Sequence, residues 1–333
     1  MQDKSFNVRR VLELLWIIAA ISLIIVNTIY IPSSATMAMF ILPIPITLIY
    51  VKKGYVVTLF ATAVSAILVS IMYNPLLVIL YTFIYVLIGI CLGYCINKGK
   101  TNSVSIIVTS ISIAVGTIAQ FIIYFKFINK IGIIGSLNLI VEGIKEPLRI
   151  AKDTYISIGA PTELIDAVNE AIKIVTVQKI IIIIPVIILA NSLIQSYINY
   201  FITSKILLKS NLKVDKITSF SRIYIPNLIA AFIIIILCLG IILDSKGIKI
   251  GTYIYGISMY ILRFLFSLDG AAFFAYIFRN KLKFSRVLSA IILLLGLILP
   301  IFSDIYLVSG TMDIILNLRE LDPNPIRKVK TRE

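Results

Sequence analysis

Histidine is absent from the 333 residues of this chain. Its absence excludes imidazole metal ligands, haem ligation by histidine, HExxH proteolysis and histidine proton relays together. Cysteine is scarce as well, and Cys91, Cys95 and Cys238 all lie inside apolar segments. In that setting they indicate small buried hydrophobic side chains rather than a disulfide framework or a zinc site. We therefore expect no metal ion and no cofactor.

Charged residues are also scarce in this chain. Only 14% of the residues are charged, whereas 59% are hydrophobic and the mean hydropathy is +1.03. Charged side chains are too few to cover such a chain in water, so the composition predicts an integral membrane protein. Because no hydrophilic stretch is long enough for a separate globular unit, we expect one integral membrane domain over residues 1–333.

The formal net charge of +15 does not indicate nucleic acid as a partner. Lysine and arginine stand in short clusters between apolar segments, which is the pattern of cytoplasmic loops beside anionic lipid. The clusters alternate along the first eight apolar segments, and a cytoplasmic N-terminus satisfies this alternation. The expected location is the cell membrane, with the lipid bilayer as partner.

Apolar runs of about 20 residues, the length that crosses a bilayer as a helix, recur along the chain. They predict an all-α polytopic transmembrane bundle of about eight or nine spans. The expected spans cover residues 11–31, 35–51, 55–72, 76–96, 104–125, 180–202, 223–243, 253–278 and 287–308. The first run is longer than the roughly 7 to 15 apolar residues of a signal peptide, so we expect an uncleaved anchor.

The end of the chain conflicts with this count, because a ninth span would place the basic tail at about 319–333 outside. Polar residues and proline interrupt the last apolar run from Pro300 to Asp313. The run either crosses and continues as an interfacial helix, or re-enters the membrane as a broken hairpin. We favour the crossing, which has the longer continuous apolar stretch.

One long hydrophilic segment, at about residues 126–179, is predicted to lie outside. Its apolar residues follow helical spacing over 137–148 and again over 164–175, and Gly159-Ala160-Pro161 separates the two patterns. Two amphipathic helices are therefore expected. They either shield the bundle at the membrane surface or form a lid over an outward-facing site.

Two charges in the eighth span are the first candidate site residues. Arg263 and Asp269 are both predicted near the bilayer midplane, where a charge costs roughly 2.5 to 3.5 kcal/mol on insertion scales. Six residues correspond to about 240° of helical rotation, so they should not pair with each other. Each requires a partner on another span or a ligand, which makes them either structural hydrogen-bonding groups or part of a substrate or ion site.

Amide side chains supply the other candidates. Asn191, Gln195 and Asn199 repeat at every fourth residue of the sixth span, and such a polar face either lines a cavity or bonds to a neighbouring helix. Gln120 in the fifth span and Asn227 at the start of the seventh are candidates for the same interior. Together with Arg263 and Asp269, they form the tentative substrate-binding set.

The order of several short motifs resembles the YybS-like family of bacterial membrane proteins of unknown function. The residues that carry the resemblance are Ile184-Pro185-Val186-Ile187-Ile188, Ser192, Asn199, Lys205-Ile206-Leu207-Leu208-Lys209, Phe220-Ser221-Arg222-Ile223-Tyr224-Ile225-Pro226, Leu268-Asp269-Gly270-Ala271-Ala272, Tyr276, Arg279, Gly310-Thr311-Met312-Asp313 and Leu318-Arg319. The resemblance covers almost the whole chain. Asp269 departs from it, because the family tends to have Gln at this position.

That family is similar in its membrane core to the substrate-binding S components of energy-coupling-factor transporters. The resemblance implies small-molecule binding or a role in transport. It does not extend to the surface by which S components dock on their coupling partner, because Ala19 and Ala20 are adjacent rather than one turn apart. The alternative is a non-transporting scaffold or regulator that binds a membrane-protein partner. We do not expect an enzyme.

Overall fold

The computed structural model describes residues 2–31, 35–215 and 217–322, and the regular elements in these ranges are helices. The prediction of an all-α membrane protein is therefore confirmed. Among the described residues, five helices are long and apolar enough to cross a membrane, and three shorter apolar helices accompany them. The predicted basic tail lies outside the described residues from residue 323 onward.

The chain divides into two compact units, and each is described here by itself. Unit 1 consists of Met1–Ser136 and Ile188–Ile217, and unit 2 consists of Leu137–Ile187 and Thr218–Glu333. The long helix α9 (Val177–Lys209) contributes its first part to unit 2 and the remainder to unit 1.

Unit 1 is built around helices that pack through aliphatic side chains. Its elements are α1 (Gln2–Tyr30), α2 (Ala35–Ile41), α3 (Pro43–Lys53), α4 (Tyr55–Ser70), α5 (Pro75–Asn97), α6 (Asn102–Ile123), the π-helical turn η2 (Tyr124–Ile128) and the second part of α9. Ile21, Leu42, Ile46 and Ile88 are fully buried at its centre. The start of α5 follows from its sequence, because Asn74 accepts a hydrogen bond from the Leu76 amide.

The Gly89-xxx-Gly93 motif of α5 serves helix packing within unit 1. A methyl group added at Gly89 would lie 2.5 Å from Ile46 Cγ2, and one at Gly93 would lie 2.6 Å from the Tyr50 ring. Both neighbours belong to α3. The two glycines therefore let α3 and α5 approach closely, as such motifs do in membranes.

The predicted span over residues 35–51 forms two helices instead of one. Helix α2 ends at Ile41 and α3 begins at Pro43. Proline has no N–H group to continue the helical ladder, and it takes the first position of α3, where that group would have no partner. The expectation of one continuous span here is wrong for that reason.

The long hydrophilic segment forms the two expected helices, α7 (Gly132–Ser157) and α8 (Thr162–Ile174). They are separated at Gly159, whose φ of +67° lies in the left-handed region that favours glycine. Leu137 and Val141 of the predicted apolar face are buried, whereas Ile144 and Leu164 are exposed.

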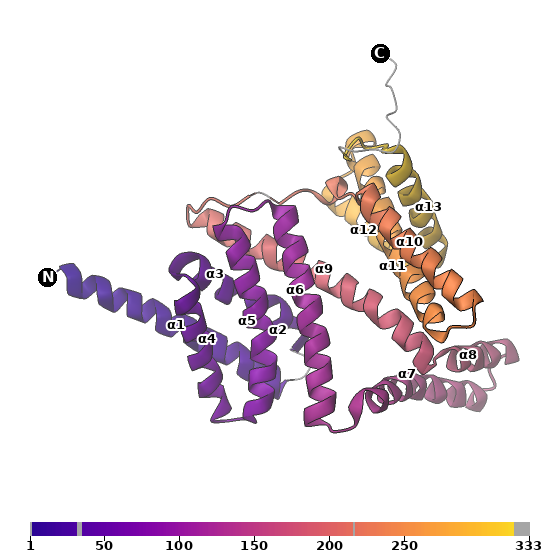
Figure 1. Ribbon diagram of the computed structural model, residues 1–333, viewed down its shortest axis with the longest axis horizontal. Helices are drawn as coiled ribbons and strands as arrows, with labels where there is room; N and C mark the ends of the chain where they lie inside the picture. The colour runs from indigo at the N-terminus through magenta and orange to yellow at the C-terminus, as the bar shows by residue number, and fades with distance from the viewer. Residues whose placement is uncertain (1, 32–34, 216, 323–333) are drawn as a thin grey trace, which may run out of the picture. The chain divides into compact units, whose positions relative to one another are not determined.

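Unit 2 also contains four helices that lie side by side (Figure 1). They are α10 (Asn227–Ser245), α11 (Lys249–Tyr276), α12 (Arg286–Ile298) and α13 (Pro300–Leu316), with the short turns η3 (Phe220–Arg222) and η4 (Ile277–Lys281). Helices α10 and α11 form a tight hairpin, because Gly240 brings α10 against the backbone of Tyr255.

The predicted continuous crossing over residues 287–308 is wrong. Helix α12 ends at Ile298, and the extended backbone of Leu299 (φ −84°, ψ 119°) is the conformation favoured before a proline. The Tyr306 hydroxyl then donates a hydrogen bond to the Leu293 carbonyl at 3.4 Å. Thirteen residues of straight helix would span about 20 Å, so α13 must fold back along α12. This fold-back agrees with the hairpin of the less favoured alternative, and its re-entry into the membrane stays a prediction.

Candidate functional site

A buried group of three charged side chains lies in unit 2, and Arg319 is its centre. Arg319 Nε donates to Asp313 Oδ2 at 2.8 Å, and Nη2 donates to Asp269 Oδ1 at 2.9 Å. The side chains of Arg319, Asp269 and Asp313 are 0%, 1% and 5% exposed. We call these three residues the buried charge cluster.

Backbone groups complete the buried charge cluster. Arg319 Nη1 donates to the carbonyl oxygens of Ser221 at 3.1 Å and Ile223 at 2.8 Å, while the Ile225 amide donates to Asp269 Oδ1 at 3.1 Å. These backbone groups lie on η3 and on the extended segment that joins it to α10. Arg319 therefore fixes this segment against α11 and α13.

Two glycines beside the cluster explain why the carboxylates meet. A methyl group on Gly270 of α11 would overlap the Tyr306 carbonyl oxygen, and one on Gly310 of α13 would overlap the Phe266 carbonyl oxygen. The contact is reciprocal. Gly270 faces the carbonyl of Tyr306, one turn before Gly310, and Gly310 faces the carbonyl of Phe266, one turn before Gly270. Such close approach is the function of small residues between membrane helices. It brings Asp269 and Asp313 to one arginine.

The segments that carry the sequence resemblance in this half of the chain therefore converge. Phe220–Pro226 supplies the backbone partners, Leu268–Ala272 supplies Asp269 and its adjacent glycine, and Gly310–Asp313 with Leu318-Arg319 supplies the rest. Of the candidate residues, Asp269 belongs to this cluster. Asp313 and Arg319 were not candidates, because their sequence positions give no sign that they meet Asp269.

An open cleft of about 460 Å³ lies elsewhere in unit 2, between the start of α9 and the first half of α11. Its lining residues are Thr176, Gln178, Lys179, Ile182, Thr252, Tyr255, Gly256, Met259, Tyr260 and Arg263. Ile182 packs against Gly256, where an added methyl group would lie 2.9 Å from Ile182 Cδ1. We call this feature the α9–α11 cleft.

Arg263 is the candidate residue that lines the α9–α11 cleft. Its guanidinium binds the Asp304 carboxylate of α13, and the two side chains are 48% and 66% exposed. Asp269 has a different partner, Arg319, in agreement with the helical angle that separates it from Arg263. Lys179 and the two tyrosines of the cleft were not predicted, because the sequence does not show that the start of α9 lies beside α11.

The amide residues of α9 form hydrogen bonds within unit 1. Gln195 Nε2 donates to the Met39 carbonyl at 2.8 Å, and Asn199 Nδ2 donates to the Gln195 carbonyl at 3.0 Å. Between them, the Ser196 hydroxyl donates to the Ile106 carbonyl at 2.7 Å. This face of α9 therefore holds other helices of unit 1. Asn191 and Gln120, on α9 and α6, are half-buried.

Asn227, at the start of α10, belongs to unit 2. Its backbone amide donates to Asp322 Oδ2 at 3.3 Å, whereas its buried side-chain amide has no hydrogen-bond partner among the described residues. The tentative set is thus distributed: Gln120, Asn191 and Gln195 lie in unit 1, and Asn227, Arg263 and Asp269 lie in unit 2.

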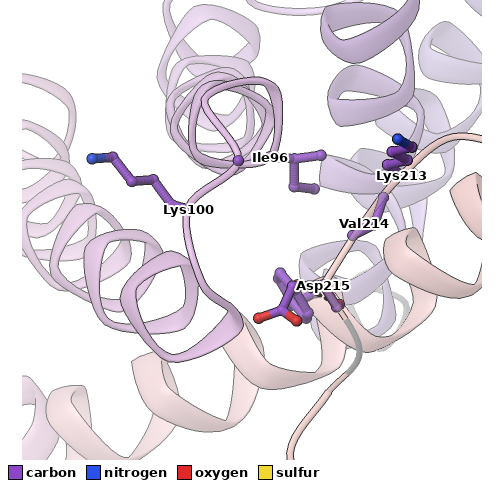
Figure 2. Close-up of a pocket in the computed structure, with 7 residues that line it drawn as sticks. Ile96, Lys100, Lys213, Val214 and Asp215 are labelled. Atoms are coloured by element: carbon purple, nitrogen blue, oxygen red, sulfur yellow. Dashed lines mark hydrogen bonds between the residues drawn. The ribbon is translucent and has the colours of Figure 1, made fainter.

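A small cavity of about 50 Å³ in unit 1 is lined by residues of the α5–α6 turn and the segment after α9 (Figure 2). The Asp215 carboxylate accepts a hydrogen bond from the Asn102 backbone amide at 3.0 Å, and the Asp215 backbone carbonyl accepts one from the Tyr200 hydroxyl at 2.8 Å. Figure 2 shows Lys100 pointing away from the Asp215 carboxylate. The volume suits water rather than an organic solute, and Asp215 caps the first turn of α6.

Comparison with known proteins gives two matches that extend along most of the chain. The model of the DUF2232 family, described as a predicted membrane protein, matches residues 17–314. The chain is also 22% identical over 318 residues to the uncharacterised protein YybS of Bacillus subtilis strain 168, covering 93% of this chain and 97% of that protein. No solved structure matches the chain. The similarity to transporter S components stays a prediction.

Proposed function

The chain belongs to the DUF2232 family of predicted membrane proteins, and from that premise we propose that it binds a small organic anion as part of a transport process. The observation that carries this proposal is the α9–α11 cleft, whose volume of about 460 Å³ lies within the range of small-molecule sites. We propose binding without chemical conversion, because the cationic and aromatic side chains of the cleft suit recognition of a ligand.

The lining residues favour an anion with an apolar or ring-shaped body. Lys179 and Arg263 contribute positive charge, and Tyr255, Tyr260 and Met259 contribute apolar surface with polar ends. Aromatic faces and cationic donors together suit a planar molecule that carries a carboxylate or phosphate. Asp304 already neutralises part of the Arg263 charge, so Lys179 is the cation left for the ligand.

Indole-3-acetate and its uncharged amide, indole-3-acetamide, are a matched pair of probes for this proposal. Titration calorimetry on the protein in lipid nanodiscs should show tighter binding of the acetate, because only it offers a carboxylate to Lys179. Lys179→Gln should weaken acetate binding by about 10- to 160-fold, the equivalent of about 1.5–3 kcal/mol for one charge-assisted hydrogen bond. Lys173→Gln is the control, since Lys173 is exposed on α8 and pairs with Glu170.

Equal binding of both probes, or an unchanged affinity in Lys179→Gln, would remove the proposed site. If neither probe nor a wider panel of ring-bearing carboxylates and phosphates binds, the scaffold alternative is favoured. Transport is tested separately: vesicles that contain the protein should accumulate a bound anion faster than vesicles that contain Lys179→Gln.

We also propose that both ends of the chain lie on the cytoplasmic side of the membrane. The alternating basic loops support a cytoplasmic N-terminus in the cell membrane. Because α13 folds back along α12, the chain leaves α13 on the side where α12 began. The basic tail would then lie inside, and the charge conflict of a ninth crossing disappears. Single cysteines placed at residues 3 and 330, in a variant whose Cys91, Cys95 and Cys238 are replaced by alanine, should resist impermeant thiol reagents in intact cells and react after lysis.

A further inference from the structure

The charges of the buried charge cluster do not balance if all its groups are ionised. Two carboxylates, Asp269 and Asp313, face one guanidinium, Arg319, and none of the three side chains is more than 5% exposed. The ionised cluster would carry a net charge of −1. An uncompensated charge costs several kcal/mol when it is buried away from water.

The guanidinium geometry places the two carboxylates close together. Nε and Nη2 of an arginine point in the same direction and match the two oxygens of one carboxylate. In this cluster they bind oxygens of two different residues, Asp313 Oδ2 at 2.8 Å and Asp269 Oδ1 at 2.9 Å. Both carboxylates are therefore within hydrogen-bonding distance of the same guanidinium. Two like charges are therefore held where one carboxylate would ordinarily lie.

The two carboxylates are not equally satisfied. Both Asp313 oxygens accept hydrogen bonds, Oδ2 from Arg319 Nε and Oδ1 from the Arg319 backbone amide. Asp269 Oδ1 accepts two, whereas Asp269 Oδ2 is buried and has no partner among the described residues. An ionised carboxylate needs donors on both oxygens, whereas a protonated oxygen is itself a donor and needs an acceptor. The Asp313 carboxylate, bound to the same guanidinium, can serve as that acceptor.

We propose that Asp269 and Asp313 share one proton, which resides mainly on Asp269 Oδ2, and that the buried charge cluster is a proton-binding site. With that proton the cluster has a net charge of zero. Two close carboxylates commonly hold one proton in this way, because both cannot be ionised at short range. The proton belongs to the pair, so its release is a property of the cluster rather than of either residue.

Release of the proton would change the net charge of the buried charge cluster from zero to −1. The other charged or titratable groups nearest to Asp269 along the chain are Arg222 and Tyr224 before α10, and Glu320 and Asp322 after α13. Helix α13 also carries Asp304 and Tyr306, and α11 carries Arg263 and Tyr276. Of these, Arg263 and Asp304 pair with each other. Arg222 and Glu320 are exposed to solvent, and Asp322 accepts the Asn227 amide. Water screens the exposed pair, so Arg319 is the cation that acts on the shared proton.

Infrared spectroscopy of protein labelled with ¹³C in its aspartate carboxyl groups tests the proposal in lipid nanodiscs. The wild-type protein should show the carbonyl-stretch band of a protonated carboxylic acid at pH 7. Asp269→Asn should abolish that band, because the remaining Asp313 and Arg319 form a neutral pair without a proton. Asp304→Asn is the control, since that carboxylate is exposed and pairs with Arg263 outside the buried charge cluster, so the band should persist.

Absence of the band from the wild-type protein, or its persistence in Asp269→Asn, would overturn the proposal. Thermal unfolding supplies a second readout. Raising the pH should lower the midpoint of the wild-type protein as the proton is lost, and it should lower that of Asp269→Asn less. An equal pH dependence in both proteins would also count against a shared proton. Neither readout depends on ligand binding in the α9–α11 cleft.

Discussion

Replacement of Arg319 by glutamine should destabilise the protein more than replacement of any exposed arginine. The guanidinium makes four hydrogen bonds, two to carboxylates and two to backbone carbonyls. Glutamine is shorter and has no charge, so both carboxylates would lose their cation inside the fold. Removing one partner of a buried ion pair costs about 3–5 kcal/mol.

Proton uptake would limit this cost, because Asp269 and Asp313 could each become protonated once Arg319 is gone. We therefore expect Arg319→Gln to lower the free energy of unfolding by about 3 kcal/mol at mildly acidic pH and by about 5 kcal/mol at alkaline pH, the lower and upper ends of that range. Arg263→Gln is the matched control. Its ion pair with Asp304 is exposed, and such pairs contribute about 0–1 kcal/mol.

The assay is reversible unfolding in mixed micelles, with the free energy of unfolding extrapolated to zero denaturing detergent for the wild type and both variants. Circular dichroism would confirm that each variant is helical before titration. The reasoning would be refuted if the two variants lost similar amounts of unfolding free energy, within about 1 kcal/mol of each other. Arg319 would then behave like an exposed residue such as Arg263.

Three further predictions concern packing and charge. Gly310→Ala should lower the thermal midpoint, because the methyl group would overlap the Phe266 carbonyl, whereas Gly143→Ala has free space and should raise helix stability by about 0.5–1 kcal/mol. Asp304→Asn should tighten indole-3-acetate binding in calorimetry, because Arg263 would be released to the cleft. Gln195→Leu should cost about 1–3 kcal/mol in the micelle assay, since the Met39 carbonyl would lose its donor.

Much of the fold can be predicted from apolar run length alone. The runs at 55–72 and 76–96 correspond closely to α4 and α5, because a helix that satisfies its own backbone is the simplest solution in hydrocarbon. Prolines changed the outcome at residues 43 and 300, where one expected span became two helices. A hydropathy pattern gives the length of an apolar run, but it does not show whether a proline within that run bends the helix or ends it.

The candidate site was harder to predict, because its groups come from segments far apart in the chain. Arg263 and Asp269 stand out in the sequence as charges within an apolar run. Their partners Asp304 and Arg319 lie 41 and 50 residues further on. Which charges meet depends on the fold-back of α13 and on the glycine contacts with α11, and neither follows from the spacing of charges.

Native mass spectrometry of the protein released from nanodiscs tests the central claim most directly. In the presence of indole-3-acetate, the wild-type protein should retain one bound anion. The double variant Lys179→Gln, Arg263→Gln should lose it, while Lys173→Gln should keep it. Retention of the anion by the double variant, or its absence from the wild type, would contradict the account that the α9–α11 cleft binds a small organic anion.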